Sequence, residues 1–190
     1  MGVKQVFTIV PVACYTTGSN LYFEGRYNYE SLKTFSLYAG KTFEKKSAVS
    51  YSVTPLAGIV TGTLNGGSIG MNTDIEYKKF CLSSQGQYTF STQNRKCSFI
   101  YNWSDLAYGL SGWLSTGFSI QYTKLYRVKG SLEKGLFINT KLKDQELALY
   151  VFNPESNGRY FILGFYFEWQ HKKKAAANIH LQNMHARYDD

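Results

Sequence analysis

The stretch Leu21-Tyr-Phe-Glu-Gly-Arg-Tyr-Asn-Tyr-Glu30 alternates between two kinds of position. One set holds mainly apolar side chains: Leu21, Phe23, Gly25, Tyr27 and Tyr29. The other set is mostly polar or charged: Tyr22, Glu24, Arg26, Asn28 and Glu30. Successive side chains of a β-strand point to opposite faces of the sheet, so this period of two predicts a strand with one apolar and one polar face.

The same alternation recurs along most of the chain, for example over residues 81–90 and 159–169. Turn-forming residues separate the alternating segments at intervals that suit antiparallel neighbours. We therefore expect an all-β, antiparallel up-and-down β-barrel over residues 1–170, followed by a polar C-terminal tail, 171–190. The expected number of strands is about ten, within a range of about eight to twelve. The strands are expected at residues 3–14, 20–30, 33–43, 47–56, 70–90 (as one strand or two), 97–108, 110–127, 135–143, 146–152 and 159–170.

The composition favours a sheet protein with few surface charges. Charged residues make up 18% of the 190 residues, below the roughly 25% that is usual for soluble domains. The formal net charge is +8, but the basic residues lie in short clusters at apparent turns and in the tail. No recognition motif accompanies them, so we do not expect nucleic acid as a partner.

Alternation alone does not say which face of a barrel is apolar. The apolar faces are crowded with large rings, for which a barrel of about ten strands has little interior volume. The polar faces carry mainly Ser, Thr, Gln, Asn and Gly, which suits a hydrated lumen. Both observations favour a membrane-type barrel, apolar outside. Aromatic residues near strand ends would then form an aromatic girdle at the membrane interfaces: Tyr22, Trp103, Tyr108, Trp113, Tyr126 and Trp169.

Four segments, 55–70, 101–105, 117–121 and 150–154, show a resemblance to a known group of proteins. They begin Pro55-Leu-Ala-Gly-Ile-Val, Tyr101-Asn-Trp-Ser, Gly117-Phe-Ser-Ile and Tyr150-Val-Phe-Asn. Over residues 20–169 the chain resembles uncharacterised, porin-like outer-membrane β-barrel proteins of Gram-negative bacteria. The resemblance implies a membrane β-barrel in the bacterial outer membrane and supplies no catalytic residues.

In this reading the polar positions line the lumen. The lumen-lining candidates are Glu24, Arg26, Asn28, Glu30, Asp74, Glu76, Lys78, Gln85 and Gln87, whereas Phe23, Tyr27 and Tyr29 should face outward. A charge in a narrow lumen is costly unless it is paired. We therefore expect Arg26 or Lys78 to pair with a carboxylate such as Glu24, Asp74 or Glu76.

Other motifs carry less chemistry. All three histidines (His171, His180 and His185) lie in the tail, so a Ser–His or Cys–His nucleophilic pair is not expected within the barrel. The glycines of residues 58–70 lack the Lys-Ser/Thr of a phosphate loop and fit a hairpin or strand kinks. Cys81 and Cys97 do not fall opposite each other in the expected register. No metal, cofactor or disulfide is expected.

The two ends of the chain raise separate expectations. Residues 1–14 make a poor secretory signal and fit a first strand, so an export signal would have been removed or replaced before Met1. The last alternating strand would close the barrel at Trp169, and residues 171–190 should add little to the fold.

The leading functional hypothesis is an outer-membrane β-barrel that serves as a pore or as a structural membrane component, and not as an enzyme. Its expected partners are membrane lipid or detergent and a small solute in the lumen. The alternative is a soluble calycin-like β-barrel that binds a small apolar ligand. An enzyme acting on lipid ranks third.

Overall fold

The computed structural model describes residues 8–167. Its strands and one short 3₁₀ helix alternate with turns along the chain. They are β1 (Val12–Thr16), β2 (Leu21–Tyr27), β3 (Thr34–Lys41), β4 (Phe43–Lys45), β5 (Ser50–Gly62), β6 (Gly66–Tyr77), β7 (Phe80–Ser91), η1 (Arg95–Cys97), β8 (Phe99–Ser111), β9 (Leu114–Leu125), β10 (Ser131–Leu142), β11 (Gln145–Phe152) and β12 (Tyr160–Phe167).

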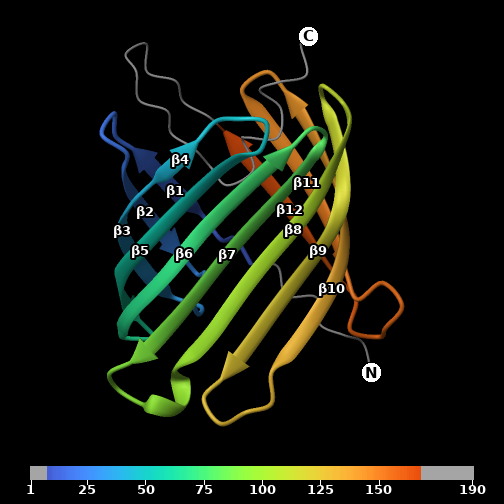
Figure 1. Ribbon diagram of the computed structural model, residues 1–190. Helices are drawn as coiled ribbons and strands as arrows, with labels where there is room; N and C mark the ends of the chain where they lie inside the picture. The colour runs from blue at the N-terminus through green and yellow to red at the C-terminus, as the bar shows by residue number, and fades with distance from the viewer. Residues whose placement is uncertain (1–7, 168–190) are drawn as a thin grey trace.

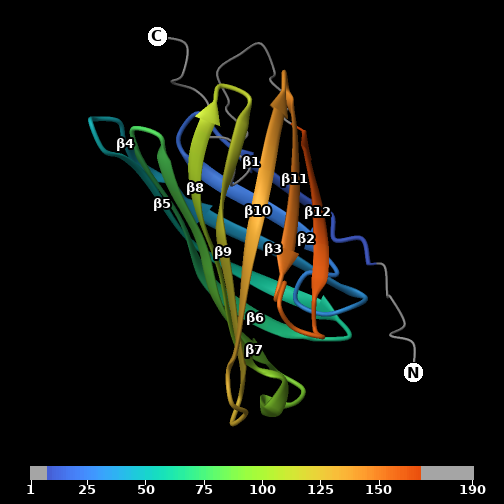
Figure 2. The same ribbon diagram turned by 90° about the vertical axis from the view of Figure 1, so that its right-hand side faces the viewer.

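All the strands belong to one antiparallel up-and-down sheet of 12 strands. The sheet order is β1-β2-β3-β5-β6-β7-β8-β9-β10-β11-β12, and β4 lies off this path, paired with β5. The sheet is strongly curled, so that β1–β3 and β11–β12 lie behind β6–β8 (Figures 1 and 2). Within the described part of the chain, no helix is long and apolar enough to cross a membrane.

The sheet is not closed into a barrel, and this corrects the closed barrel that the alternation predicted. Among residues 8–167, β1 and β12 remain the two edges of the sheet. The path without β4 contains an odd number of strands, and each neighbouring pair is antiparallel, so β1 and β12 run in the same direction. An antiparallel up-and-down barrel closes with an even number of strands. The strand count lies at the upper end of the predicted range.

Several strand boundaries also differ from the prediction. The 70–90 segment is two strands, because Lys78 has a left-handed φ of 53° and starts a tight turn with Lys79. The glycine-rich segment ends β5 and begins β6 around a short turn, and Gly62 has a φ of 128° that a side chain rarely adopts. The first described strand, β1, begins at Val12 and runs past the predicted end at residue 14 to Thr16, and residues 3–7 of the predicted strand lie outside the described part.

The two faces of the sheet differ in polarity. We call the concave side, which carries Glu24, Arg26 and Gln87, the inner face, and the opposite side the outer face. Large apolar side chains are exposed on the outer face, and on β12 Phe161 and Leu163 have 64% and 68% of their surface exposed. This arrangement agrees with the predicted alternation.

The residues predicted to form the aromatic girdle differ in their exposure. Tyr108, Trp113 and Tyr126 are exposed near strand ends, but Tyr22 is buried on the inner face, where its hydroxyl donates to Glu24. Trp103 also points inward and donates its indole N–H to Asp105. Trp169 lies outside the described residues.

Candidate functional site

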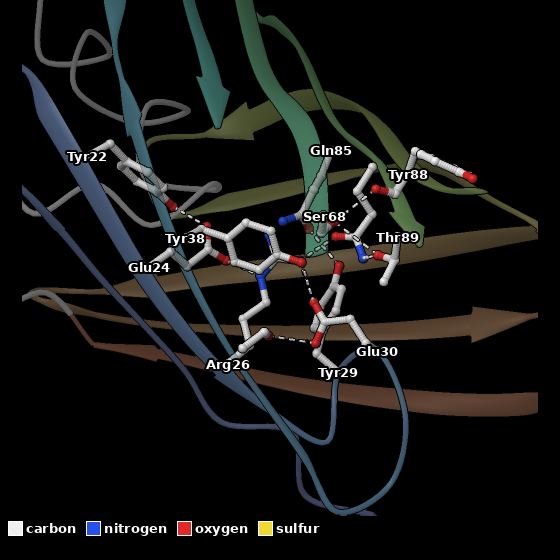
Figure 3. A network of polar contacts seen from close by, with 12 residues as sticks. Tyr22, Glu24, Arg26, Tyr29, Glu30, Tyr38, Ser68, Gln85, Tyr88 and Thr89 are labelled. Atoms are coloured by element: carbon white, nitrogen blue, oxygen red, sulfur yellow. Dashed lines mark hydrogen bonds and ion pairs between the residues drawn. The ribbon is translucent and has the colours of Figure 1, made fainter. Parts of the chain in front are cut away.

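A buried ion-pair network occupies the inner face near β2 and β3 (Figure 3). Arg26 Nε lies 2.6 Å from Glu24 Oε1, and its Nη1 lies 3.3 Å from Glu30 Oε1. The Arg26 side chain has none of its surface exposed. We call Tyr22, Glu24, Arg26, Tyr29, Glu30, Tyr38 and Gln87 the polar cluster. The predicted pairing of Arg26 with Glu24 is confirmed.

Strand geometry places the first members of this cluster. Tyr22, Glu24 and Arg26 occupy alternate positions of β2, so all three point to the inner face. The Tyr22 hydroxyl donates to Glu24 Oε2 at 2.6 Å, and Arg26 Nε donates to the other carboxylate oxygen. One carboxylate therefore accepts hydrogen bonds from both neighbours on its own strand.

The turn after β2 brings in the remaining carboxylate. Asn28 has a φ of 59°, and its side-chain oxygen accepts a hydrogen bond from the Lys33 backbone N–H. Glu30, two residues further on, accepts hydrogen bonds from Tyr38 at 2.8 Å and from Ser36 at 2.7 Å. The turn thus folds Glu30 back over the inner face of β3.

The cluster also crosses the concave side of the sheet. Arg26 Nη1 donates to Gln87 Oε1 on β7 at 2.5 Å. The Tyr29 hydroxyl donates to Gln85 Oε1 at 2.6 Å. Burial raises the pKa of the Tyr29 hydroxyl to about 12. Side chains from β2 and its turn therefore reach β7, although β3, β5 and β6 lie between them in the sheet.

Two tyrosine rings flank the guanidinium. The Arg26 Cζ atom lies 4.5 Å from the ring centroid of Tyr29 and 4.4 Å from that of Tyr38. Cation–π contacts of this kind are strongest when the cation is desolvated. Arg26 Nη2, however, is buried without a hydrogen-bond partner among the described residues.

The other lumen-lining candidates lie in different surroundings. Gln87 is buried beside Arg26. Asp74 accepts a hydrogen bond from Ser83 at 2.9 Å, and Glu76 stands opposite Cys81 in the register of β6 and β7. The structure thus places Glu24, Arg26, Glu30, Asp74, Glu76, Gln85 and Gln87 on the inner face.

Asn28, Lys78 and Tyr29 differ from their expected positions. Asn28 stabilises the turn after β2, where its side-chain N–H donates to the Ile9 carbonyl oxygen. Lys78 is exposed in the β6–β7 turn, with its Nζ 5.2 Å from the Tyr77 ring. Tyr29 points inward, because the left-handed Asn28 interrupts the alternation on which its outward position was predicted.

A second buried group lies on the inner face of β8 to β12, and the sequence pattern did not predict it. We call Trp103, Asp105, Phe137, Tyr150 and Phe152 the aromatic cluster. The Tyr150 ring lies 5.3 Å from Trp103 and 5.1 Å from Phe137, centroid to centroid. Phe152 is fully buried. Small residues on the strands between, such as Gly135, leave room for these rings.

Asp105 is the polar centre of the aromatic cluster. It accepts hydrogen bonds from Trp103 Nε1 at 2.8 Å, from Ser119 Oγ at 2.5 Å and from the Tyr150 hydroxyl at 3.0 Å. A buried carboxylate is stable only when hydrogen bonds replace its hydration. The Trp-Ser-Asp spacing on one strand is the signal in the sequence that could have indicated this group.

The cysteines and carboxylates of the described part form no disulfide and no group that could hold a metal ion. Cys14, Cys81 and Cys97 are free thiols. Between residues 8 and 167, no group of three or more His, Cys, Asp or Glu side chains is placed to hold a metal ion. The inner face presents hydrogen bonds and ion pairs, with Arg26 at the centre of the polar cluster and Asp105 at the centre of the aromatic cluster. The predicted tail and its histidines lie outside the described residues.

Comparisons with protein-family models, with curated proteins and with solved structures found no match for this chain.

Proposed function

We propose that this chain is an integral membrane protein of the bacterial outer-membrane type, embedded through the outer face of its sheet. It serves there as a structural component or as a narrow pore with a polar interior, and this role requires the edge strands β1 and β12 to be paired or covered, because unpaired strand edges are not stable in hydrocarbon. The observation that carries the proposal is the inverted polarity of the sheet. The side chain of Arg26 is completely buried among acids and tyrosines on the inner face, while large apolar side chains cover the outer face.

The outer face has the composition of a lipid-contacting surface. Outward positions of β5 to β12 carry apolar, small polar or basic side chains. Examples with roughly half or more of their surface exposed are Ile59, Ile69, Phe118, Leu132 and Phe165. Soluble proteins rarely expose a contiguous apolar surface of this kind. Lipid tails would cover this apolar surface at no cost in free energy.

The strand lengths suit a bilayer. β5 to β10 have 12 or 13 residues each. At about 3.3 Å per residue, 12 residues span about 40 Å along the strand. With the tilt of about 45° that is usual for spanning strands, this length covers about 28 Å, close to the hydrocarbon thickness of about 30 Å.

The polar cluster bears on the choice between a wide and a narrow pore. Arg26 joins β2 to Gln87 on β7, so side chains bridge the interior at that level. We propose that any solute path through the protein is narrow and bounded by Arg26. Replacing Arg26 in a conducting protein should then raise the single-channel conductance.

The test is refolding in detergent and in phospholipid vesicles. The proposal expects a folded form that needs detergent or lipid, migrates differently on a gel before and after heating, and resists protease on its strands. A chain that folds as a soluble monomer in plain buffer and binds a small apolar ligand would instead support the calycin-like alternative. Folding in buffer with no lipid association contradicts the membrane proposal.

A further inference from the structure

Acidic and basic side chains occupy different parts of this protein. The inner face collects acidic side chains that outnumber its basic ones, Arg26 and Lys141. The inward acids are Glu24, Glu30, Asp74, Glu76, Asp105, Glu133 and Glu146. The chain as a whole nevertheless carries a net charge of +8, so its positive charge must lie elsewhere.

Much of that positive charge lies at the two rims of the sheet. We call the ends formed by residues 44–49, 78–79 and 143–144 the short-turn rim, and the ends formed by residues 92–98, 126–130 and 153–159 the long-loop rim. The two rims lie at opposite ends of the strands (Figure 1). Exposed basic residues at the short-turn rim are Lys45, Lys46, Lys78, Lys79 and Lys143. Those at the long-loop rim are Arg95, Lys96, Arg127, Lys129 and Arg159.

Exposed acids at these rims are fewer. Glu44 and Asp144 lie at the short-turn rim and Glu155 lies at the long-loop rim. Each rim is therefore net basic. An apolar outer face bounded above and below by basic residues is complementary to a bilayer whose headgroups carry negative charge.

Aromatic contacts provide a second, independent observation. The Lys78 Nζ atom lies 5.2 Å from the ring of Tyr77, and the Arg127 Cζ atom lies 5.3 Å from the ring of Tyr126. Both tyrosines are exposed, one at each rim, where the apolar outer face ends. Tyrosine is the side chain that prefers the boundary between hydrocarbon and headgroups. In a chain embedded through its outer face, a cation beside such a ring would lie near the lipid phosphates.

We propose that the two basic rims bind the anionic headgroups of phospholipids and so favour insertion into negatively charged bilayers. The inference rests on the proposed membrane function and adds the lipid class that the protein selects. The chemistry is direct: ammonium and guanidinium groups donate to phosphate oxygens, and the acids on the inner face do not compete, because they face away from the lipid.

The experiment measures the partitioning of the refolded protein into phosphatidylcholine vesicles and into vesicles in which phosphatidylglycerol replaces part of that lipid. A cation near an anionic surface strengthens association by about fivefold. We expect at least a tenfold preference for the anionic vesicles, and we expect it to be lost near 1 M salt, where the Debye length is about 3 Å. Inserted protein is scored by its heat-dependent gel mobility.

Two variants locate the effect at the rims. Replacing Lys45, Lys46, Lys78 and Lys79 together with Gln should reduce the preference for anionic vesicles several-fold while leaving insertion into phosphatidylcholine unchanged. The matched control replaces the same four residues with Arg, which keeps the charge and should keep the preference. Replacing Arg95, Lys96, Arg127 and Lys129 with Gln tests the long-loop rim in the same way.

The possible failures are distinguishable. Equal partitioning of the unmodified protein into both kinds of vesicle would overturn the headgroup inference and leave the membrane proposal intact. A preference that survives in both Gln variants would overturn the assignment to the rims. No insertion into either kind of vesicle would overturn the membrane proposal, and the headgroup inference with it.

Discussion

The polar cluster and the aromatic cluster fill two parts of the same inner face by different physical means. In the polar cluster, one cation is held by two carboxylates, an amide and two rings, and it joins β2 to β7. In the aromatic cluster, Phe152 packs against Gly135 of β10, and a single carboxylate accepts the polar hydrogens of Trp103 and Tyr150. In the polar cluster, loss of one partner should therefore cause a large drop in the free energy of unfolding. In the aromatic cluster, the drop should scale with the side-chain volume removed.

Replacing Arg26 with Met should have the largest effect. It leaves two carboxylates on the inner face without their cation, and breaking a buried ion pair by removing one partner costs about 3–5 kcal/mol. The free energy of unfolding, measured by urea titration in detergent, should fall by that amount. The double variant Arg26→Met with Glu24→Gln should lose less than Arg26→Met alone. If the double variant is the less stable of the two, the network is not held together by charge.

The aromatic cluster offers a pair of phenylalanines for comparison. Phe152→Ala should lower the free energy of unfolding by about 3–4 kcal/mol, because it removes a fully buried ring and leaves a cavity. Phe161→Ala, on the neighbouring strand but 64% exposed on the outer face, should cost far less in detergent. Equal losses would mean that the outer face is packed against protein.

Gly58→Ala tests how closely the polar cluster is packed against the sheet. A Cβ atom at Gly58 would clash with the Leu37 carbonyl oxygen and lie 2.5 Å from the ring of Tyr38, so both the backbone of β3 and the ring that contacts Arg26 and Glu30 must shift. Overpacking of this kind costs about 1–3 kcal/mol. Gly25→Ala is the control, since its Cβ would meet Leu37 at an ordinary 3.5 Å. The melting temperature of Gly58→Ala should therefore be lower than that of Gly25→Ala.

Part of this architecture could be predicted from the sequence, because period two is a local property of strands. The inward positions of Glu24 and Arg26 followed from it directly, and so did the outward position of Phe23. The contact of Arg26 with Gln87 on β7 could not be predicted in this way. Gln87 is 61 residues away from Arg26, and the two side chains meet only through the curl of the sheet. The open edge could not be predicted either. Closure depends on the number of strands along the sheet path, and the sequence does not show that β4 lies off that path.

β8 shows where the pattern misleads. Its outward positions include Asn102 and Ser104, whose side chains hydrogen-bond to each other and to Ser84. Its inward positions include Trp103, which was predicted to face outward in the aromatic girdle. Polarity is thus locally reversed on this strand. A rule that assigns apolar residues outward fails wherever neighbouring strands satisfy polar groups on the outer face.

The smallest effect is expected from the Tyr22 hydroxyl, and it separates hydrogen bonding from ring packing within the polar cluster. Tyr22 is buried and donates to Glu24 at 2.6 Å. Hydrogen bonds to charged groups contribute about 1.5–3 kcal/mol, but Glu24 keeps its bond from Arg26 Nε. We therefore expect Tyr22→Phe to cost about 1.5 kcal/mol, at the lower end of that range. Tyr27→Phe, with an exposed ring on the outer face of the same strand, should cost almost nothing. Urea titration of both variants in the same detergent gives the comparison. If Tyr22→Phe is as harmless as Tyr27→Phe, Glu24 is satisfied by Arg26 alone, and the polar cluster is smaller than we describe.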